Sequence, residues 1–226
     1  AHERGVVVDV ENHALPGHVL GQEVRLLEAL AAAQEPSDIA VFYDGGNELA
    51  RQKERNGRGR GTDESPTSFL EVDLDDFLWN GPREPGQQAW DRRTWWRPGP
   101  TVTPEQVAHH AMNRYRRDLA LGRRIASSFG VRPVFVWQPL LHSAPARAAR
   151  PGAVPPEDEP IWSAMVPAAL AELPDEVVDL SDSLDDATSP VFDDYYHTNE
   201  WAARVVARQL LDSIWDDVIA ARGAIR

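Results

Sequence analysis

The order of apolar and polar positions predicts short strands that alternate with amphipathic helices along the chain. Runs rich in β-branched and aromatic residues predict buried strands at 5–10, 38–43, 131–137 and 177–180. Between the first two runs, residues 21–34 form a predicted helix, whose apolar face comprises Leu20, Val24, Leu27 and Ala31. Strands that alternate with helices favour an α/β fold around a parallel sheet.

Two more helices are predicted in the second half of the chain. Thr103 can cap a helix, Pro104 suits its first position, and Gln106 completes a capping box, so a helix is expected over 103–128. A last helix extends from residue 198 or 199 to about 221, and its apolar face comprises Ala202, Val205, Val206, Leu210, Ile214 and Ile219.

Residues 51–100 interrupt this alternation and are interpreted as an insertion in a single domain spanning 1–226. The first part, 51–65, is polar, charged and rich in Gly, which predicts a loop. The second part carries six large aromatic residues: Phe69, Phe77, Trp79, Trp90, Trp95 and Trp96. Two interpretations stand with equal weight, a lid or wall over a substrate cleft and a hydrophobic cluster that anchors a surface excursion. A further irregular loop is predicted over 143–159.

Composition excludes several classes of function. Of the 226 residues, 42% are hydrophobic and 26% are charged, as in an ordinary globular domain, and no apolar run approaches the length of a membrane span. A net charge of −13 argues against binding to nucleic acid or anionic lipid. The absence of cysteine excludes disulfides, thiolate catalysis and cysteine-based metal sites. The chain begins at Ala1, and this composition is compatible with either a cytoplasmic or an exported protein.

Asp194 and His197 form a D-x-x-H sequence immediately before the last predicted helix. At this spacing, on a turn or in the first helical turn, the two side chains can meet. A carboxylate that accepts a hydrogen bond from one imidazole nitrogen fixes the tautomer and leaves the other nitrogen free to act as a base. In the alternative interpretation, Asp194 only helps to start the helix.

A second set of candidates lies near the first two predicted strands. Asn47 belongs to a Gly-Gly-Asn turn after the strand at 38–43, at the strand end where open α/β sheets bind ligands. Its amide can donate to a developing oxyanion, or the segment can be a plain turn. Gly17 would let a backbone N–H approach a substrate oxygen, or would simply form the entry loop of the first helix. His18 beside it is a candidate for substrate contact.

In this order and at these places in the chain, the motifs resemble those of the SGNH (GDSL-type) hydrolases. That family has a Gly-Asp-Ser nucleophile turn, then a Gly, then an Asn in a Gly-x-Asn-Asp turn, and finally a D-x-x-H. Residues 12–48 are similar to the second and third blocks, 135–139 to an intervening strand end, and 192–210 to the last block.

The resemblance implies a three-layer α/β/α sandwich with a parallel, flavodoxin-like sheet, and esterase activity without a cofactor or metal. It also implies that Gly17 and Asn47 are oxyanion-hole donors, that His197 is the base and that Asp194 orients it. The substrate would be an ester of a carbohydrate, a lipid or a small metabolite. Trp95, Trp96 and His18 are candidate substrate contacts, and replacing the two tryptophans with Ala is expected to weaken substrate binding.

The chain departs from the family pattern in two places. Glu48 stands where the family usually has Asp, and the nucleophile block is absent, because no serine occurs in residues 1–16. The sequence S-D-S-L at 181–184 follows a late strand and lacks the Gly of the nucleophile turn, which predicts a solvated turn instead. A non-catalytic binding or accessory domain that has lost the nucleophile is therefore the alternative function. An acyltransferase is a third hypothesis.

The strand order of the expected fold predicts what the absence of the nucleophile block does to the sheet. In a flavodoxin-like sheet of order 2-1-3-4-5, the first strand is central, so the strands at 5–10 and 38–43 would need it between them. Without it, buried backbone groups would stay unpaired. We therefore expect a domain that lacks its first strand, with an N-terminal segment or a second chain supplying both that strand and the serine. A compact, cooperatively folding monomer of this chain alone would contradict this expectation.

Overall fold

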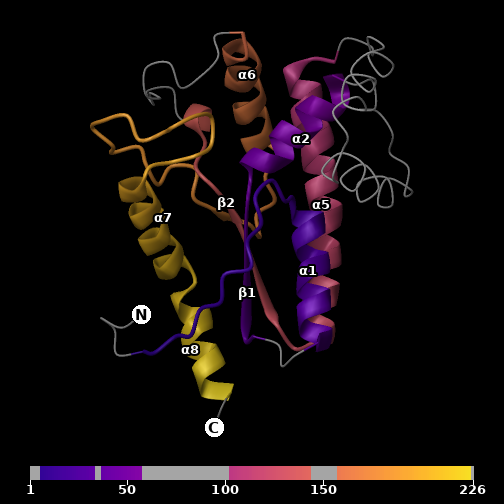
Figure 1. The fold of residues 1–226 in the computed structure, drawn as a ribbon, viewed down its shortest axis with the longest axis vertical. Helices are drawn as coiled ribbons and strands as arrows, with labels where there is room; N and C mark the ends of the chain where they lie inside the picture. Colours follow the sequence, from indigo (N-terminus) through magenta and orange to yellow (C-terminus); the bar gives the residue numbers. More distant parts are fainter. Residues whose placement is uncertain (1–5, 34–36, 58–101, 144–156, 225–226) are drawn as a thin grey trace, which may run out of the picture.

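Three parallel strands form the sheet of the computed structural model, which describes residues 6–33, 37–57, 102–143 and 157–224 (Figure 1). They are β1 (Ile39–Asp44), β2 (Arg132–Trp137) and β3 (Val178–Asp179), in the order β1-β2-β3. Phe42 lies opposite Phe135 in the first pair, and Val136 opposite Val178 in the second. The predicted α/β class with a parallel sheet is thereby confirmed.

Helices lie on both sides of these strands. In the described part of the chain they are α1 (Leu20–Ala33), α2 (Gly46–Gly57), α5 (Pro104–Ser128), α6 (Glu159–Leu170), α7 (Glu200–Ser213), α8 (Trp215–Ala224) and a short 3₁₀ turn, η2 (Leu141–Ser143). Helix α1 contacts β1, α5 contacts β2, and α2 and α6 pack on α5. Figure 1 shows α1 and α5 on one side of the strands and α7 and α8 on the other. This arrangement is compatible with a three-layer α/β/α layout.

The capping residues predicted for α5 act as expected. The Thr103 hydroxyl accepts a hydrogen bond from the Gln106 N–H at 3.3 Å, and the Gln106 side chain accepts one from the Thr103 N–H at 2.9 Å. The last predicted helix is two helices, with a break at Ile214. Because Ile214 and Val218 are both buried, the break allows α8 to turn its apolar side toward β1.

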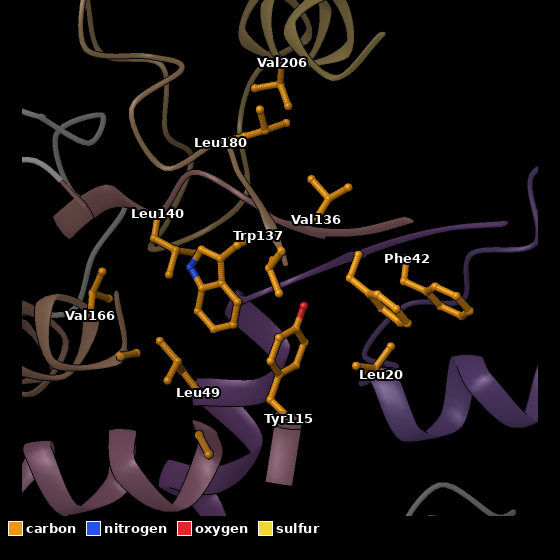
Figure 2. Packing of buried hydrophobic residues seen from close by; sticks show 14 of the residues in the cluster. Leu20, Phe42, Leu49, Tyr115, Val136, Trp137, Leu140, Val166, Leu180 and Val206 are labelled. Carbon is orange, nitrogen blue, oxygen red and sulfur yellow. The ribbon is translucent and has the colours of Figure 1, made fainter. Parts of the chain in front are cut away.

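Aromatic side chains fill the space between the sheet and α5. Phe42 and Phe135 stack with ring centroids 5.1 Å apart, and Tyr115 meets the Trp137 ring edge-on at 5.4 Å. Figure 2 shows Trp137 surrounded by Leu49, Tyr115 and Leu140, while Val136 points the opposite way, toward Leu180 and Val206. The alternation along β2 thus places apolar side chains in both layers, as expected for a strand covered on both faces.

The strand predicted at 5–10 is not formed by the described residues 6–10, so that prediction was wrong. Val6 is buried in the core, but Val7 and Val10 are 92% and 77% exposed. A β-branched run becomes a strand only where a neighbouring strand offers hydrogen bonds and a surface to pack on. Among the described residues, β1 pairs on one edge only, with β2.

The loop predictions at 51–65 and 143–159 were wrong where they meet α2 and the start of α6. Helix α2 has no apolar stripe, and its polar residues Gln52 and Asn56 bond to each other at 2.8 Å within the helix. Helix α6 contains Pro167, which lies exposed on its outer side. The remaining parts of both predicted loops lie outside the described residues.

Candidate active site

The carboxyl ends of β1 and β2 and the loop before α7 meet at one edge of the sheet. Because the strands are parallel, the turn after Asp44 and the segment after Trp137 both lie there. A Cβ atom added to Gly45 would lie 2.9 Å from the Gln138 side chain, so these two segments touch. This is the edge at which open α/β sheets bind ligands.

Asp194 and His197 meet as their spacing predicts. The imidazole Nδ1 lies 2.6 Å from one Asp194 carboxylate oxygen. The other oxygen accepts hydrogen bonds from the backbone N–H groups of Tyr196 and His197, at 2.9 and 2.7 Å. The His197 side chain is 67% exposed, and within the described residues its Nε2 atom has no hydrogen-bond partner. The pair thus presents one imidazole nitrogen to solvent while holding the other.

The electrostatics of Asp194 follow from these contacts. Partial burial raises the pKa of this carboxyl, but the hydrogen bonds from the His197 ring and the two backbone N–H groups outweigh burial and bring the pKa below its ordinary value. Asp194 therefore stays ionised in neutral solution, as a residue that orients an imidazole requires.

Backbone hydrogen bonds close the loop that carries the pair. Phe192 and Thr198 form an isolated antiparallel bridge, and the Asp193 N–H donates to the His197 carbonyl at 2.8 Å. The loop is also tied to the segment after β2, since the Leu141 N–H donates to the Tyr195 carbonyl at 2.9 Å. These contacts fix an exposed histidine on an ordered backbone.

Two tyrosines anchor this loop. Tyr195 stacks on Trp162 of α6 with ring centroids 4.6 Å apart. Tyr196 packs against the turn after β1 so closely that a Cβ atom on Gly46 would lie 2.5 Å from Cγ of the tyrosine. Only glycine fits at position 46 without movement of that ring. The contact joins the neighbour of His197 to the neighbour of Asn47.

Hydrogen bonds also join the turn that carries Asn47 to the segment before α1. The Asn47 side-chain N–H₂ group donates to the His18 carbonyl at 2.9 Å, and Arg51 donates to the Gly17 carbonyl at 3.1 Å. Gly17 is exposed and has a φ of 76°, a conformation that favours glycine. The structure thus brings Gly17, His18 and Asn47 together, and the Tyr196 contact links them to the Asp194–His197 pair.

The other predicted site residues fall elsewhere. Trp95 and Trp96 lie outside the described residues. The turn predicted at 181–184 is present, but it is not solvated throughout, because Ser183 is buried and its hydroxyl donates to the Leu180 carbonyl at 2.7 Å. In the described ranges, no serine hydroxyl is bonded to His197, and no group of three or more His, Asp or Glu side chains could hold a metal ion.

Four carboxyl groups gather beneath this edge of the sheet: Glu23, Asp44, Glu48 and Asp118. Burial, together with the neighbouring Glu48 charge, raises the pKa of Glu23 to about 7. Burial also raises the pKa of Asp118 to about 7, although the nearby Arg114 opposes the shift. No local pattern in the sequence predicts this cluster, because its members come from four separate elements.

The raised pKa values predict that the protein is more stable in mild acid. Between about pH 4 and about pH 7, the native state holds protons on Glu23 and Asp118 that the unfolded chain has released, so the free energy of unfolding should fall as pH rises through this range. Urea unfolding at several pH values would measure the slope. Asp118→Asn should make this slope smaller, whereas Asp186→Asn, which alters an exposed carboxyl, should leave the slope unchanged. An unchanged slope in Asp118→Asn would contradict the prediction.

Comparison with known proteins found no relative of this chain. No family model, curated protein or solved structure matches the chain. Within the described residues, no helix is long and apolar enough to cross a bilayer.

Proposed function

We propose that this protein is a serine-type ester hydrolase of the SGNH kind. The observation that carries the proposal is the 2.6 Å contact of Asp194 with His197 Nδ1, beside the turn that holds Asn47. An imidazole oriented by a carboxylate, with its second nitrogen exposed, is suited to general-base catalysis. The structural role of starting a helix belongs to Asn199, whose side chain accepts from the Ala202 N–H at 3.0 Å. Asp194 is therefore not needed as the cap of α7.

In the proposed reaction, a serine hydroxyl attacks the ester carbonyl while His197 Nε2 takes its proton. The carbonyl oxygen becomes an oxyanion that accepts hydrogen bonds from the Gly17 N–H and the Asn47 amide. As the tetrahedral intermediate collapses, the imidazolium gives its proton to the departing alcohol. Water then repeats the attack on the acyl-enzyme and releases the acid and the serine. Asp194 stays ionised and balances the charge on the imidazolium.

The serine comes, in this proposal, from a segment outside the described residues. A substrate with an acyl group on a carbohydrate, a lipid or a small metabolite would suit an exposed edge of this kind. The second candidate function is a binding or accessory domain of the same fold. It is favoured by one observation, which is that no serine among the described residues bonds to His197.

Labelling with a fluorophosphonate distinguishes the two candidates, because the reagent reacts with activated serines. Both this chain and the product of the full coding sequence should be labelled, and the modified peptide mapped by mass spectrometry. We expect label on a serine outside the described residues, together with loss of label in His197→Asn. No label on either folded protein would favour the binding domain. Label on a described serine remote from His197 would overturn the assignment of roles.

A further inference from the structure

The Glu48 carboxylate joins two segments that are distant in sequence. One of its oxygens accepts the Leu20 N–H and the other accepts the Gly45 N–H, each at 2.9 Å. The residue is only 7% exposed, so water competes little for these charge-assisted hydrogen bonds. Leu20 begins α1 and Gly45 lies in the turn after β1, so a single side chain fixes the start of the helix against the turn.

The same two segments carry both proposed oxyanion donors. Gly17 lies just before Leu20, and Asn47 lies just after Gly45. The Asn47 amide gives one of its two N–H bonds to the His18 carbonyl, which leaves the other for a substrate oxygen. The distance between the two donors therefore depends on how firmly these segments are tied. Glu48 supplies one tie between them, through Leu20, and holds its own turn through Gly45.

Asp44, the last residue of β1, completes the arrangement. It is 3% exposed and its side chain is hydrogen-bonded to Glu48. Two carboxyl groups can share a hydrogen bond only if one of them keeps its proton. Backbone N–H groups favour the ionised form of Glu48, whereas no backbone N–H group of the described residues favours ionised Asp44. The proton therefore belongs on Asp44, which donates to Glu48.

The groups around the pair support this placement of the proton. Burial raises the pKa of Asp44 well above its ordinary value, and the charges of Glu48, Glu23 and Asp118 raise it further. Tyr115 also faces the pair, and within the described residues its hydroxyl has no hydrogen-bond partner. The cations that act on the neighbouring Asp118 are Arg114, Arg25 and Arg117, and each lowers the pKa of that carboxyl.

We propose that Glu48 is a positioning residue for the oxyanion hole, and that Asp44 holds it in place as a neutral hydrogen-bond donor. The proposal rests on the proposed function, and it names a role for the Glu that replaces the usual Asp of the family. Glu48 touches no substrate. It acts by holding the Gly45 and Leu20 backbones, and through them Asn47 and Gly17.

Three variants test the proposal, each measured by the hydrolysis of a nitrophenyl acyl ester and by the amide hydrogen exchange of Leu20 and Gly45. Glu48→Gln offers one oxygen where two are needed, so we expect exchange at both amides to accelerate and kcat to fall about 10- to 100-fold with KM unchanged. Asp44→Asn keeps a neutral donor and should stay within about threefold of the parent protein in kcat. Asp44→Ala removes the donor and should behave like Glu48→Gln.

A matched carboxylate variant separates positioning from general damage to the fold. Glu172→Gln is the matched control, since Glu172 accepts hydrogen bonds from His109 and Arg116 far from the turn. It should leave kcat and the two amides unchanged.

The outcomes distinguish this inference from the proposed function. If Glu48→Gln leaves the exchange of Leu20 and Gly45 unchanged, the positioning role is overturned, whatever the activity. If Asp44→Asn impairs the protein as severely as Asp44→Ala, Asp44 is not the neutral donor. If the parent protein hydrolyses no ester but its amides respond as expected, the proposed function fails and the structural tie through Glu48 stands.

Discussion

Replacing His197 with Asn will lower kcat for ester hydrolysis by about 10³-fold or more, while the free energy of unfolding changes by less than about 0.5 kcal/mol. The large kinetic effect is expected because His197 is the proposed acceptor of the serine proton. The small effect on stability is expected because the side chain is 67% exposed and its hydrogen bond is made at the surface. Steady-state kinetics and urea unfolding measure the two quantities separately.

A second histidine–carboxylate pair gives a matched control. His109 lies 2.9 Å from Glu172 on the outside of α5, with a side chain that is 55% exposed. His109→Asn should leave kcat unchanged. Asp194→Asn should retain the fold and lose about as much activity as His197→Asn, because the imidazole would then lack its orienting carboxylate. Equal, small effects at His109 and His197 would exclude general-base catalysis by His197.

Replacing Trp137 with Ala will lower the free energy of unfolding by about 3 to 5 kcal/mol, the usual range for truncating a large buried aromatic. Trp137 is fully buried at the end of β2, where it meets Tyr115 and lies against Gly45. Removing the indole would leave a cavity directly beneath the turn that holds Asn47, so the rate of ester hydrolysis should fall as well. Urea unfolding followed by far-ultraviolet circular dichroism would measure the loss.

Two tryptophan variants show whether burial is the cause. Trp201→Ala should change stability by less than about 0.5 kcal/mol, because that side chain is 54% exposed. Trp137→Phe should cost clearly less than Trp137→Ala, since it keeps a ring and removes an indole N–H that has no partner within the described residues. A Trp137→Ala protein as stable as Trp201→Ala would show that the core does not depend on this residue.

Local signals in the sequence predicted the parts of the fold that depend on local interactions. The capping residues around Thr103 marked the start of α5 correctly, and the β-branched runs marked β1 and β2 to within a residue. The valines at 6–10 look the same in sequence, but whether a run pairs depends on the neighbour it finds. Helix α2 was not predicted, because its sequence has no repeating apolar pattern. It is held instead by the buried Leu49 and by contacts with α5.

The candidate site was predictable in its chemistry but not in its connections. The spacing of Asp194 and His197 indicated that they could meet, and Asn47 was placed after a strand. The contact of Tyr196 with Gly46, and the hydrogen bond from the Leu20 N–H to Glu48, join segments that are far apart in sequence. The second glycine of the Gly-Gly-Asn turn was the one visible signal, because a residue without Cβ permits such close approach.

The pairing of Phe42 with Phe135 has a consequence for the synthesis of the protein. Some ninety residues separate the two strands, and a ribosome adds roughly 5 to 20 residues per second, so β1 waits on the order of 5 to 20 seconds for its partner. Through that interval, helix α1 can form from local contacts, but the sheet cannot. Val41 and Tyr43, which are 43% exposed even in the finished fold, are then uncovered entirely. The nascent chain should therefore depend on chaperones most strongly between the emergence of β1 and that of β2.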